Sequence, residues 1–312
     1  MTRFAAIDCG TNAIRLLVAD VIDGRITEVS RRMLTVRLGE GVDATGELST
    51  QALARTFAAV EDYACDIARL GARATRMVAT SASRDARNAQ VFIDGVRDRL
   101  GIEPEVVAGI EEAQLSFSGA IRGLSATLVD SPVLVADIGG GSTEFVLGDA
   151  TSGLIASMCS VDVGCVRMTE RHLHGDPPTI EQIDQAVVTI DHILDSAFAE
   201  VDVSQVRTFV GLAGSVTTVA AIAHRLPEYD PVAIHGSVTS LQQVEQVADR
   251  LVGMTRAERS AEPVMHPGRV DVIAGGALVL RQIMRRLPVG LVVASETDLL
   301  DGIVYRLSTG VA

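Results

Sequence analysis

Residues 133–147, with the sequence VLVADIGGGSTEFVL, contain the pattern that decides the fold of this chain. An apolar, β-branched run predicts a strand that ends at Asp137, three glycines allow the backbone to turn, and a second apolar run follows Glu144. Backbone N–H groups in such a turn, with the hydroxyls of Ser142 and Thr143, can surround phosphate oxygens. Asp137 and Glu144 can hold a metal ion or a water molecule beside them. The alternative is a glycine-rich hairpin that binds no ligand.

A second copy of this pattern lies near the N-terminus, where Asp8 ends an apolar run. Gly10 follows two residues later, then Thr11 and Asn12, and another apolar run begins. The two aspartates are separated by about the length of one domain. Because each half offers an acidic turn that contains glycine, the sequence predicts a duplicated α/β domain.

The composition limits the class of protein. The chain has 312 residues and 47% hydrophobic residues, enough for two domains that each have a core. Its net charge of −13 argues against binding to nucleic acid or to an anionic membrane. All 27 basic residues are arginine, which excludes a phosphate loop that needs lysine. No apolar stretch is long enough to span a bilayer and no signal peptide is recognisable, so we expect a cytoplasmic protein.

Periodic patterns in the first half predict strands and helices in alternation. Strands are expected over 4–7, 14–19, 26–36 and 75–80, and helices over 50–70 and 89–100. A further helix begins at Gly109 and has Glu111 and Glu112 in its first turn. Adjacent carboxylates there are usually helix-dipole partners in water. This helix immediately precedes the glycine-rich strand, however, which makes Glu112 a candidate base. Arg84 can bind phosphate or belong to a solvated loop.

The second half continues the same alternation. Capping boxes at Thr179 and Ser240 predict two helices, the first of which extends to about Val201. A strand over 207–211 leads into a helix at Gly214 and Ser215, an arrangement that suits an anion at the helix N-terminus. A last strand is expected over 288–293, and a final helix over 297–307 that packs back on the first domain.

These segments, in this order and at these separations, resemble the exopolyphosphatase and guanosine pentaphosphate phosphohydrolase family (Ppx/GppA) over essentially the whole chain. The octapeptide Asp137–Glu144 and the Glu-Glu-Ala start of the helix at Gly109 are its most specific parts. The other matching segments are 8–12, 80–84, 162–167, 211–218, 235–236 and 267–276. The chain resembles the short two-domain form, so long-polymer binding that depends on further C-terminal domains is not expected.

The resemblance implies an α/β fold of duplicated ribonuclease-H-like (actin-like) domains that flank a central cleft. Residues 1–125 would form the first domain, completed by a C-terminal helix within 297–312, and residues 126–296 the second. The resemblance also implies a hydrolase of terminal phosphoanhydride bonds that depends on Mg²⁺, or on Mn²⁺.

Roles for individual residues follow from the resemblance by position. It implies that Glu112 activates water, that Glu144 is a second catalytic group, and that Asp8, Asp137 and Glu144 are metal ligands. The expected phosphate-binding residues are Thr11, Asn12, Arg84, Gly139, Gly140, Gly141, Ser142, Gly214 and Ser215. One departure is Gln114, where many members carry arginine, and this loss of a positive charge can weaken substrate binding or change the preferred chain length.

The sequence-based hypothesis is therefore an exopolyphosphatase that releases orthophosphate from inorganic polyphosphate. One alternative is a phosphohydrolase that converts pppGpp to ppGpp, and another is a weakly catalytic sensor that binds polyphosphate or an alarmone. An actin-like kinase fits less well, because Glu112 and the Glu144 turn match hydrolases more closely. Polyphosphate or pppGpp is the expected partner, with neither nucleic acid nor membrane, and a homodimer is left open.

Overall fold

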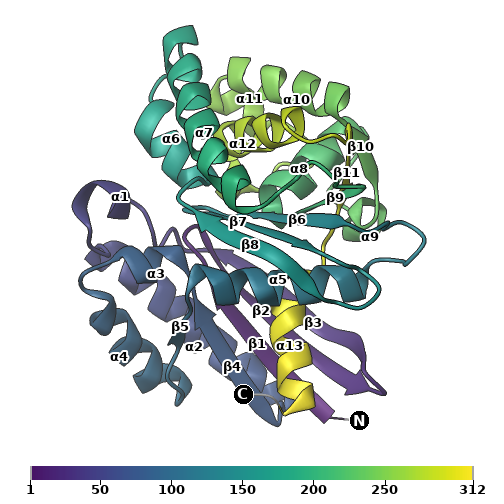
Figure 1. The fold of residues 1–312 in the computed structure, drawn as a ribbon. Helices are drawn as coiled ribbons and strands as arrows, with labels where there is room; N and C mark the ends of the chain where they lie inside the picture. The colour runs from purple at the N-terminus through teal and green to yellow at the C-terminus, as the bar shows by residue number, and fades with distance from the viewer. Residues whose placement is uncertain (1, 311–312) are drawn as a thin grey trace. The chain divides into compact units, whose positions relative to one another are not determined.

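The structure is a computed structural model that describes residues 2–310 (Figure 1). The chain forms two compact units, one made of residues up to 119 together with those from 299 on, and the other of residues 120–298. The elements of the first unit are β1 (Thr2–Cys9), β2 (Ala13–Ile22), β3 (Arg25–Thr35), α1 (Val42–Thr45), α2 (Thr50–Leu70), β4 (Ala74–Ala79), α3 (Ser81–Asp85), α4 (Ala89–Leu100), β5 (Glu105–Val106), most of α5 (Gly109–Gly123) and α13 (Leu299–Thr309).

The second unit contains the larger number of helices. Its elements are β6 (Val133–Ile138), β7 (Thr143–Gly148), β8 (Ile155–Val161), α6 (Cys165–His172), α7 (Ile180–Glu200), β9 (Thr208–Leu212), α8 (Ala213–Ala223), α9 (Pro231–Ile234), β10 (Val238–Ser240), α10 (Leu241–Gly253), α11 (Arg256–Ser260), the 3₁₀ helix η1 (Pro267–Arg269), α12 (Ile273–Arg285) and β11 (Leu291–Ala294).

The two sheets repeat one topology. The first has the strand order β3-β2-β1-β4-β5, in which β1, β2 and β3 are antiparallel neighbours and β4 runs parallel to β1 and β5. The second has the order β8-β7-β6-β9-β11 with the same directions, and β10 adds an antiparallel edge. This repeat confirms the predicted fold class of duplicated ribonuclease-H-like, actin-like α/β domains.

Strand β1 is buried on both faces, because helices cover both sides of the first sheet. Its odd-numbered residues, such as Ile7, join the core below α2 and α4, while Phe4 and Ala6 join the core formed with α5 and α13. Helix α13, yellow in Figure 1, contributes Leu300 and Ile303 to that second core. Helix α13 therefore belongs to the first unit, together with β1 and α5.

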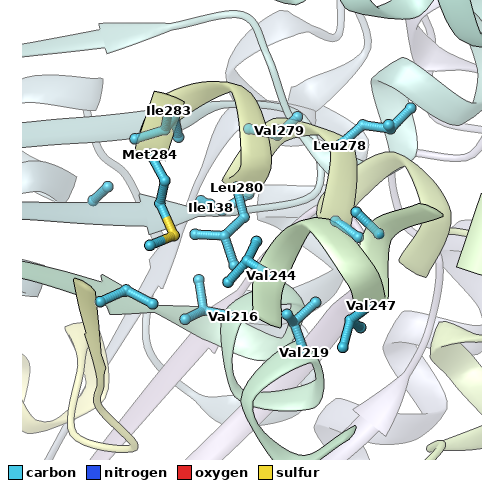
Figure 2. Close-up of a cluster of buried hydrophobic side chains, with 14 of the residues drawn as sticks. Ile138, Val216, Val219, Val244, Val247, Leu278, Val279, Leu280, Ile283 and Met284 are labelled. Carbon is cyan, nitrogen blue, oxygen red and sulfur yellow. The ribbon is translucent and has the colours of Figure 1, made fainter. Parts of the chain in front are cut away.

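Helix α12 lies at the centre of the second unit. Figure 2 shows Leu280 and Met284 of α12 packed among Val216 of α8, Val244 of α10 and Ile138 of β6. Twelve of its thirteen residues are buried. No helix was predicted over this segment, whose first residues were noted only as part of the resemblance to the family.

Several predicted boundaries agree with the structure. Helix α2 spans Thr50–Leu70 and ends at Gly71, whose φ of 70° closes the last turn. The capping boxes at Thr179 and Ser240 are both present. The last strand was predicted over 288–293 but spans Leu291–Ala294, because Pro288 has no N–H to donate to a sheet. Within residues 2–310, no helix combines the length and the apolar character that a membrane span requires.

Candidate active site

The first acidic turn connects β1 to β2. Asp8 stands opposite Arg15 in the register of the two strands, and Nε and Nη2 of Arg15 donate to Oδ2 of Asp8 over 2.9 and 2.6 Å. Asp8 is buried and follows Phe4 and Ala6 on the face of the sheet that α5 covers. The Asp8 carboxylate is therefore held by two charge-assisted hydrogen bonds from one guanidinium group.

Backbone bonds fix the shape of this turn. The N–H of Gly10 donates to the carbonyl of Ala13 over 3.0 Å. The carbonyl of Thr11 accepts from the N–H of Gly39 over 2.8 Å, and residues 36 and 37 both donate to the carbonyl of Asn12. The hydroxyl of Thr11 is 2.8 Å from that of Ser81 at the start of α3. The segment after β3 donates hydrogen bonds to the backbone carbonyls of Thr11 and Asn12. These two predicted phosphate-binding residues therefore have a defined conformation.

Glu112 and Glu111 occupy different environments at the start of α5. Nη1 of Arg84 lies 3.3 Å from Oε2 of Glu112 and also donates to the carbonyl of Val107. Glu112 is buried, with 8% of its surface exposed. The structure thus brings together the two predicted site residues Arg84 and Glu112, and places Arg84 on the short helix α3 instead of in a solvated loop.

Glu111 has a structural role that explains the second carboxylate of the pair. Its Oε1 accepts hydrogen bonds from Nη2 of Arg76 on β4 and Nη1 of Arg306 on α13, both over 2.8 Å. These contacts connect α5 to a strand and to the last helix of the same unit. Glu111 therefore takes part in ion pairs that connect elements of the unit, while Glu112 is the candidate for chemistry.

The glycine-rich turn connects β6 to β7 with the geometry of the first turn. Gly139 donates its N–H to the carbonyl of Ser142 over 3.0 Å, as Gly10 does to Ala13. A Cβ at Gly139 would lie 3.0 Å from that same carbonyl oxygen, so a larger residue would press against the turn. Close approach of the backbone, and not a left-handed φ, is therefore what this glycine provides.

The first residues of α6 donate hydrogen bonds to the backbone carbonyls of the glycine-rich turn. N–H groups of the first residues of α6 donate to the carbonyls of Gly139 and Gly140 over 2.9 to 3.1 Å, and Nε of Arg167 donates to that of Gly141 over 2.7 Å. Among residues 2–310, none of the turn and loop bonds between backbone groups uses the N–H of Gly140, Gly141 or Ser142 as donor. Backbone N–H groups in a turn of this kind are the donors that a phosphate-binding turn uses.

Asp137 and Glu144 form a pair across β6 and β7. They stand directly opposite each other in the register, which places both carboxylates on one face of the sheet. Both are buried, and Oε1 of Glu144 accepts a hydrogen bond from the hydroxyl of Ser160 on β8 over 2.7 Å. Hard carboxylate oxygens are the ligands that Mg²⁺ prefers, and one or two of them usually suffice, because water and substrate phosphates complete the coordination.

This pair fits a divalent cation better than Asp8 does. Asp8 belongs to the first unit and is already bonded by the guanidinium of Arg15. Among residues 2–310, no group of three or more His, Cys, Asp or Glu side chains is placed to hold a metal ion by protein ligands alone. The residues therefore suit a cation that is bound by two protein carboxylates and completes its coordination with water and with phosphate oxygens of the substrate.

Gly214 and Ser215 lie in the first turn of α8, which begins beside the Asp137 turn. Leu212, the residue before α8, is the register partner of Asp137 in the parallel pair of β9 and β6. The guanidinium of Arg269 occupies the space where a Cβ of Gly214 would be, and its Nη1 donates to Thr218 over 2.9 Å. A positive side chain thus accompanies the predicted anion site at this helix start.

Two buried cysteines adjoin these turns. Burial raises the pKa of the Cys9 thiol well above its usual value, and the charge of Asp8 adds to the shift. Burial also raises the pKa of the Cys165 thiol. Both thiols therefore remain protonated near neutral pH, which argues against a thiolate nucleophile or a thiolate ligand in either turn.

Three residues that complete these turns were not predicted from the sequence: Arg15, Ser160 and Arg269. A signal for Arg15 was present, because it follows Asp8 at the same spacing by which Glu144 follows Asp137. Ser160 could not be recognised, because only strand register places it beside Glu144. Arg269 lay within a segment that resembles the family, without any pattern that pointed to Gly214.

Comparison with known proteins agrees with this geometry. The family model described as the Ppx/GppA phosphatase family matches residues 17–309. Exopolyphosphatase 2 of Mycobacterium tuberculosis is 45% identical, over 99% of this chain and 99% of that protein. The guanosine-5'-triphosphate,3'-diphosphate pyrophosphatase of Vibrio atlanticus is 28% identical, over 97% of this chain and 59% of that protein.

A solved structure supports the same assignment. The crystal structure of an exopolyphosphatase-like protein superposes with a TM-score of 0.96 and 42% sequence identity, covering 100% of this chain and 99% of that one. The family model, the full-length relative and the shared fold agree, and the enzyme described here belongs to the Ppx/GppA phosphatase family.

Proposed function

We propose that this enzyme is an exopolyphosphatase that hydrolyses the terminal phosphoanhydride bonds of inorganic polyphosphate and releases orthophosphate. The observation that carries the proposal is the buried Glu112, held beside Arg84, in a chain that is 45% identical over its full length to a protein named exopolyphosphatase. The glycine-rich turn, with its backbone N–H donors, supports it because a phosphate chain offers only acceptor oxygens.

The proposed mechanism assigns one task to each group of residues. Glu112 orients a water molecule and accepts its proton as the water attacks the terminal phosphorus. Arg84, bonded to Glu112 and to the carbonyl of Val107, keeps that carboxylate in place and can also bind a phosphate oxygen. The N–H groups of Gly140, Gly141 and Ser142, and the hydroxyl of Ser142, donate to phosphate oxygens.

We further propose that Asp137 and Glu144 hold a Mg²⁺ or Mn²⁺ ion. Ser160 supports this role because its hydroxyl fixes the Glu144 carboxylate. When bound, the ion would neutralise charge on the phosphate oxygens of the substrate. An acidic protein can then bind a polyanion through backbone dipoles, a few arginines and a metal.

A substrate panel tests the proposed activity. Phosphate release from tripolyphosphate, long polyphosphate, pppGpp and ATP is measured with purified protein and either Mg²⁺ or Mn²⁺. We expect kcat/KM for a polyphosphate to exceed that for pppGpp by about tenfold, which corresponds to about 1.4 kcal/mol of transition-state stabilisation. A higher value for pppGpp would favour the alternative of a pppGpp 5'-phosphohydrolase, in line with the name of the Vibrio relative. No release from either substrate would reject both.

The cation site has its own prediction. Glu144→Gln and Asp137→Asn each remove one of the two opposed carboxylates and are expected to weaken Mn²⁺ binding by about 10- to 100-fold, measured by isothermal titration calorimetry. Glu181→Gln, a change in the same unit on the first turn of α7, serves as the matched control and is expected to bind Mn²⁺ as the wild type does. Unchanged Mn²⁺ affinity in both variants would refute the site.

The remaining assignments follow from the proposed substrate. We propose a cytoplasmic enzyme whose partner is polyphosphate, with no nucleic acid or membrane partner, in accord with its net charge of −13. A weakly catalytic sensor is the second candidate, and Gln114 is the one residue that favours it. Its position is next but one to Glu112 on α5, where an arginine would add a positive charge.

A further inference from the structure

The two acidic turns share their geometry but differ in the charge that faces the aspartate. In each unit an aspartate is the penultimate residue of the first strand, and the residue opposite it in the register follows seven positions later. The closing bonds, from Gly10 to Ala13 and from Gly139 to Ser142, are both 3.0 Å long. The opposing residue is Arg15 in the first unit and Glu144 in the second.

The same difference extends to the third strand of each sheet. Arg15 is the register partner of Met33 on β3, and Glu144 is the register partner of Ser160 on β8. A hydroxyl beside Glu144 donates to its carboxylate, whereas a thioether beside Arg15 cannot orient a carboxylate. Two of the three members of the row therefore differ between the units: the aspartate is followed by arginine and methionine in one, and by glutamate and serine in the other.

The contact between Arg15 and Asp8 is close and largely removed from water. Nε and Nη2 both donate to Oδ2, and the exposed fractions of the two side chains are 22% for Arg15 and 7% for Asp8. Arginine remains protonated at any pH at which the protein is folded. A divalent cation at Asp8 would have to displace this guanidinium or lie next to its positive charge, and both are unfavourable in a partly dehydrated turn.

We propose that Arg15 is the built-in counter-ion of the first turn and takes the place that a divalent cation has in the second. Asp8 then is not a metal ligand, in contrast to the expectation from the sequence. The neutral Asp8–Arg15 pair lets a polyanion approach the donors of the first turn, and Arg15 is a positioning residue for substrate. This inference rests on the proposed function for the substrate and on the proposed cation site for the metal.

Mn²⁺ titration by calorimetry, without substrate, tests the metal part of the inference. Wild type is expected to bind one Mn²⁺, and Asp8→Asn to bind it within about twofold of wild type, while Asp137→Asn loses about tenfold or more. Arg15→Glu copies the charge pattern of the second turn and is expected to gain a second Mn²⁺. A loss of tenfold or more in Asp8→Asn would overturn the inference, as would a single Mn²⁺ in a folded Arg15→Glu variant.

The substrate part is tested with tripolyphosphate binding in the presence of EDTA. Arg15→Gln is expected to bind it about tenfold more weakly, because the charge of Asp8 is then uncompensated. The double variant Asp8→Asn/Arg15→Gln, which removes both charges together, should recover most of that loss. Failure of the double variant to recover would overturn the inference. If Arg15→Glu or Asp8→Asn does not fold, the Mn²⁺ titration is made with the double variant. This variant also lacks the Asp8 carboxylate and is expected to bind Mn²⁺ within about twofold of wild type.

These readouts separate the inference from the proposed activity. Mn²⁺ stoichiometry and tripolyphosphate affinity do not require turnover. If wild type hydrolyses neither polyphosphate nor pppGpp while Asp8→Asn keeps its Mn²⁺, the proposed function fails and the role of Arg15 stands. If hydrolysis is found but Asp8→Asn loses Mn²⁺ as Asp137→Asn does, the role of Arg15 fails and the function stands.

Discussion

Replacing Glu112 by glutamine is expected to lower kcat for polyphosphate hydrolysis by roughly 10³-fold with little change in KM. The amide has the shape of the carboxylate and can still accept a hydrogen bond from Arg84, but it cannot accept a proton from water. Steady-state phosphate release gives both constants, and calorimetric titration with tripolyphosphate shows whether binding persists. Retained binding with lost turnover would reject the alternative of a sensor.

The neighbouring residue offers a matched control. Glu111→Gln lies one position earlier on α5 and removes contacts with Arg76 and Arg306. We expect kcat within about threefold of wild type and a loss of stability of about 1 kcal/mol or less, because these ion pairs are partly exposed. If Glu111→Gln abolishes turnover and Glu112→Gln does not, the assignment of the base is wrong.

Replacing Gly302 by alanine is expected to destabilise the first unit by about 3 kcal/mol. Gly302 is buried on α13, and a Cβ there would collide with the backbone carbonyl of Leu115 on α5. A backbone atom in the middle of a helix cannot rotate away as a side chain could. The two helices must therefore separate, and Ile303 would lose its place in the core. Urea unfolding followed by circular dichroism measures the change as a lower midpoint.

Gly253 provides the corresponding control. It is the last residue of α10, and a Cβ at this position meets no atom within 4 Å. Gly253→Ala should therefore be neutral or stabilising by up to about 1 kcal/mol, because alanine restricts the unfolded chain and favours the helix. Equal midpoints for Gly302→Ala and wild type would show that α13 does not pack on α5 as described.

Much of the fold was predictable, because its signals are local. Asp8 and Asp137 each end an apolar strand before a turn that contains glycine, and this repeat alone indicated duplication. The capping box at Thr179 and the end of α2 at Gly71 could likewise be predicted from a few adjacent residues. Glu112 was identified by position, and the structure adds the contact with Arg84 that distinguishes it from Glu111.

The rest depends on contacts between segments that are distant in the sequence. Ser160 reaches Glu144 only through the register of β7 and β8, and Arg269 reaches Gly214 only through the packing of η1 against α8. The position of Arg15, seven residues after Asp8, could be read from the sequence, but its ion pair with Asp8 is known only from the structure.

The return of α13 to the first unit has a consequence for synthesis on the ribosome. Leu300 and Ile303 belong to the core that contains Phe4 and Ala6, yet they are translated after the whole of the second unit. At common bacterial elongation rates this delay is about 10 to 40 s. Until α13 is made, the face of the first sheet that carries Phe4 and Ala6 lacks the apolar side chains of that helix. The first unit is thus the earlier of the two to begin synthesis, but the core that contains Phe4 and Ala6 is completed only by the last helix of the chain.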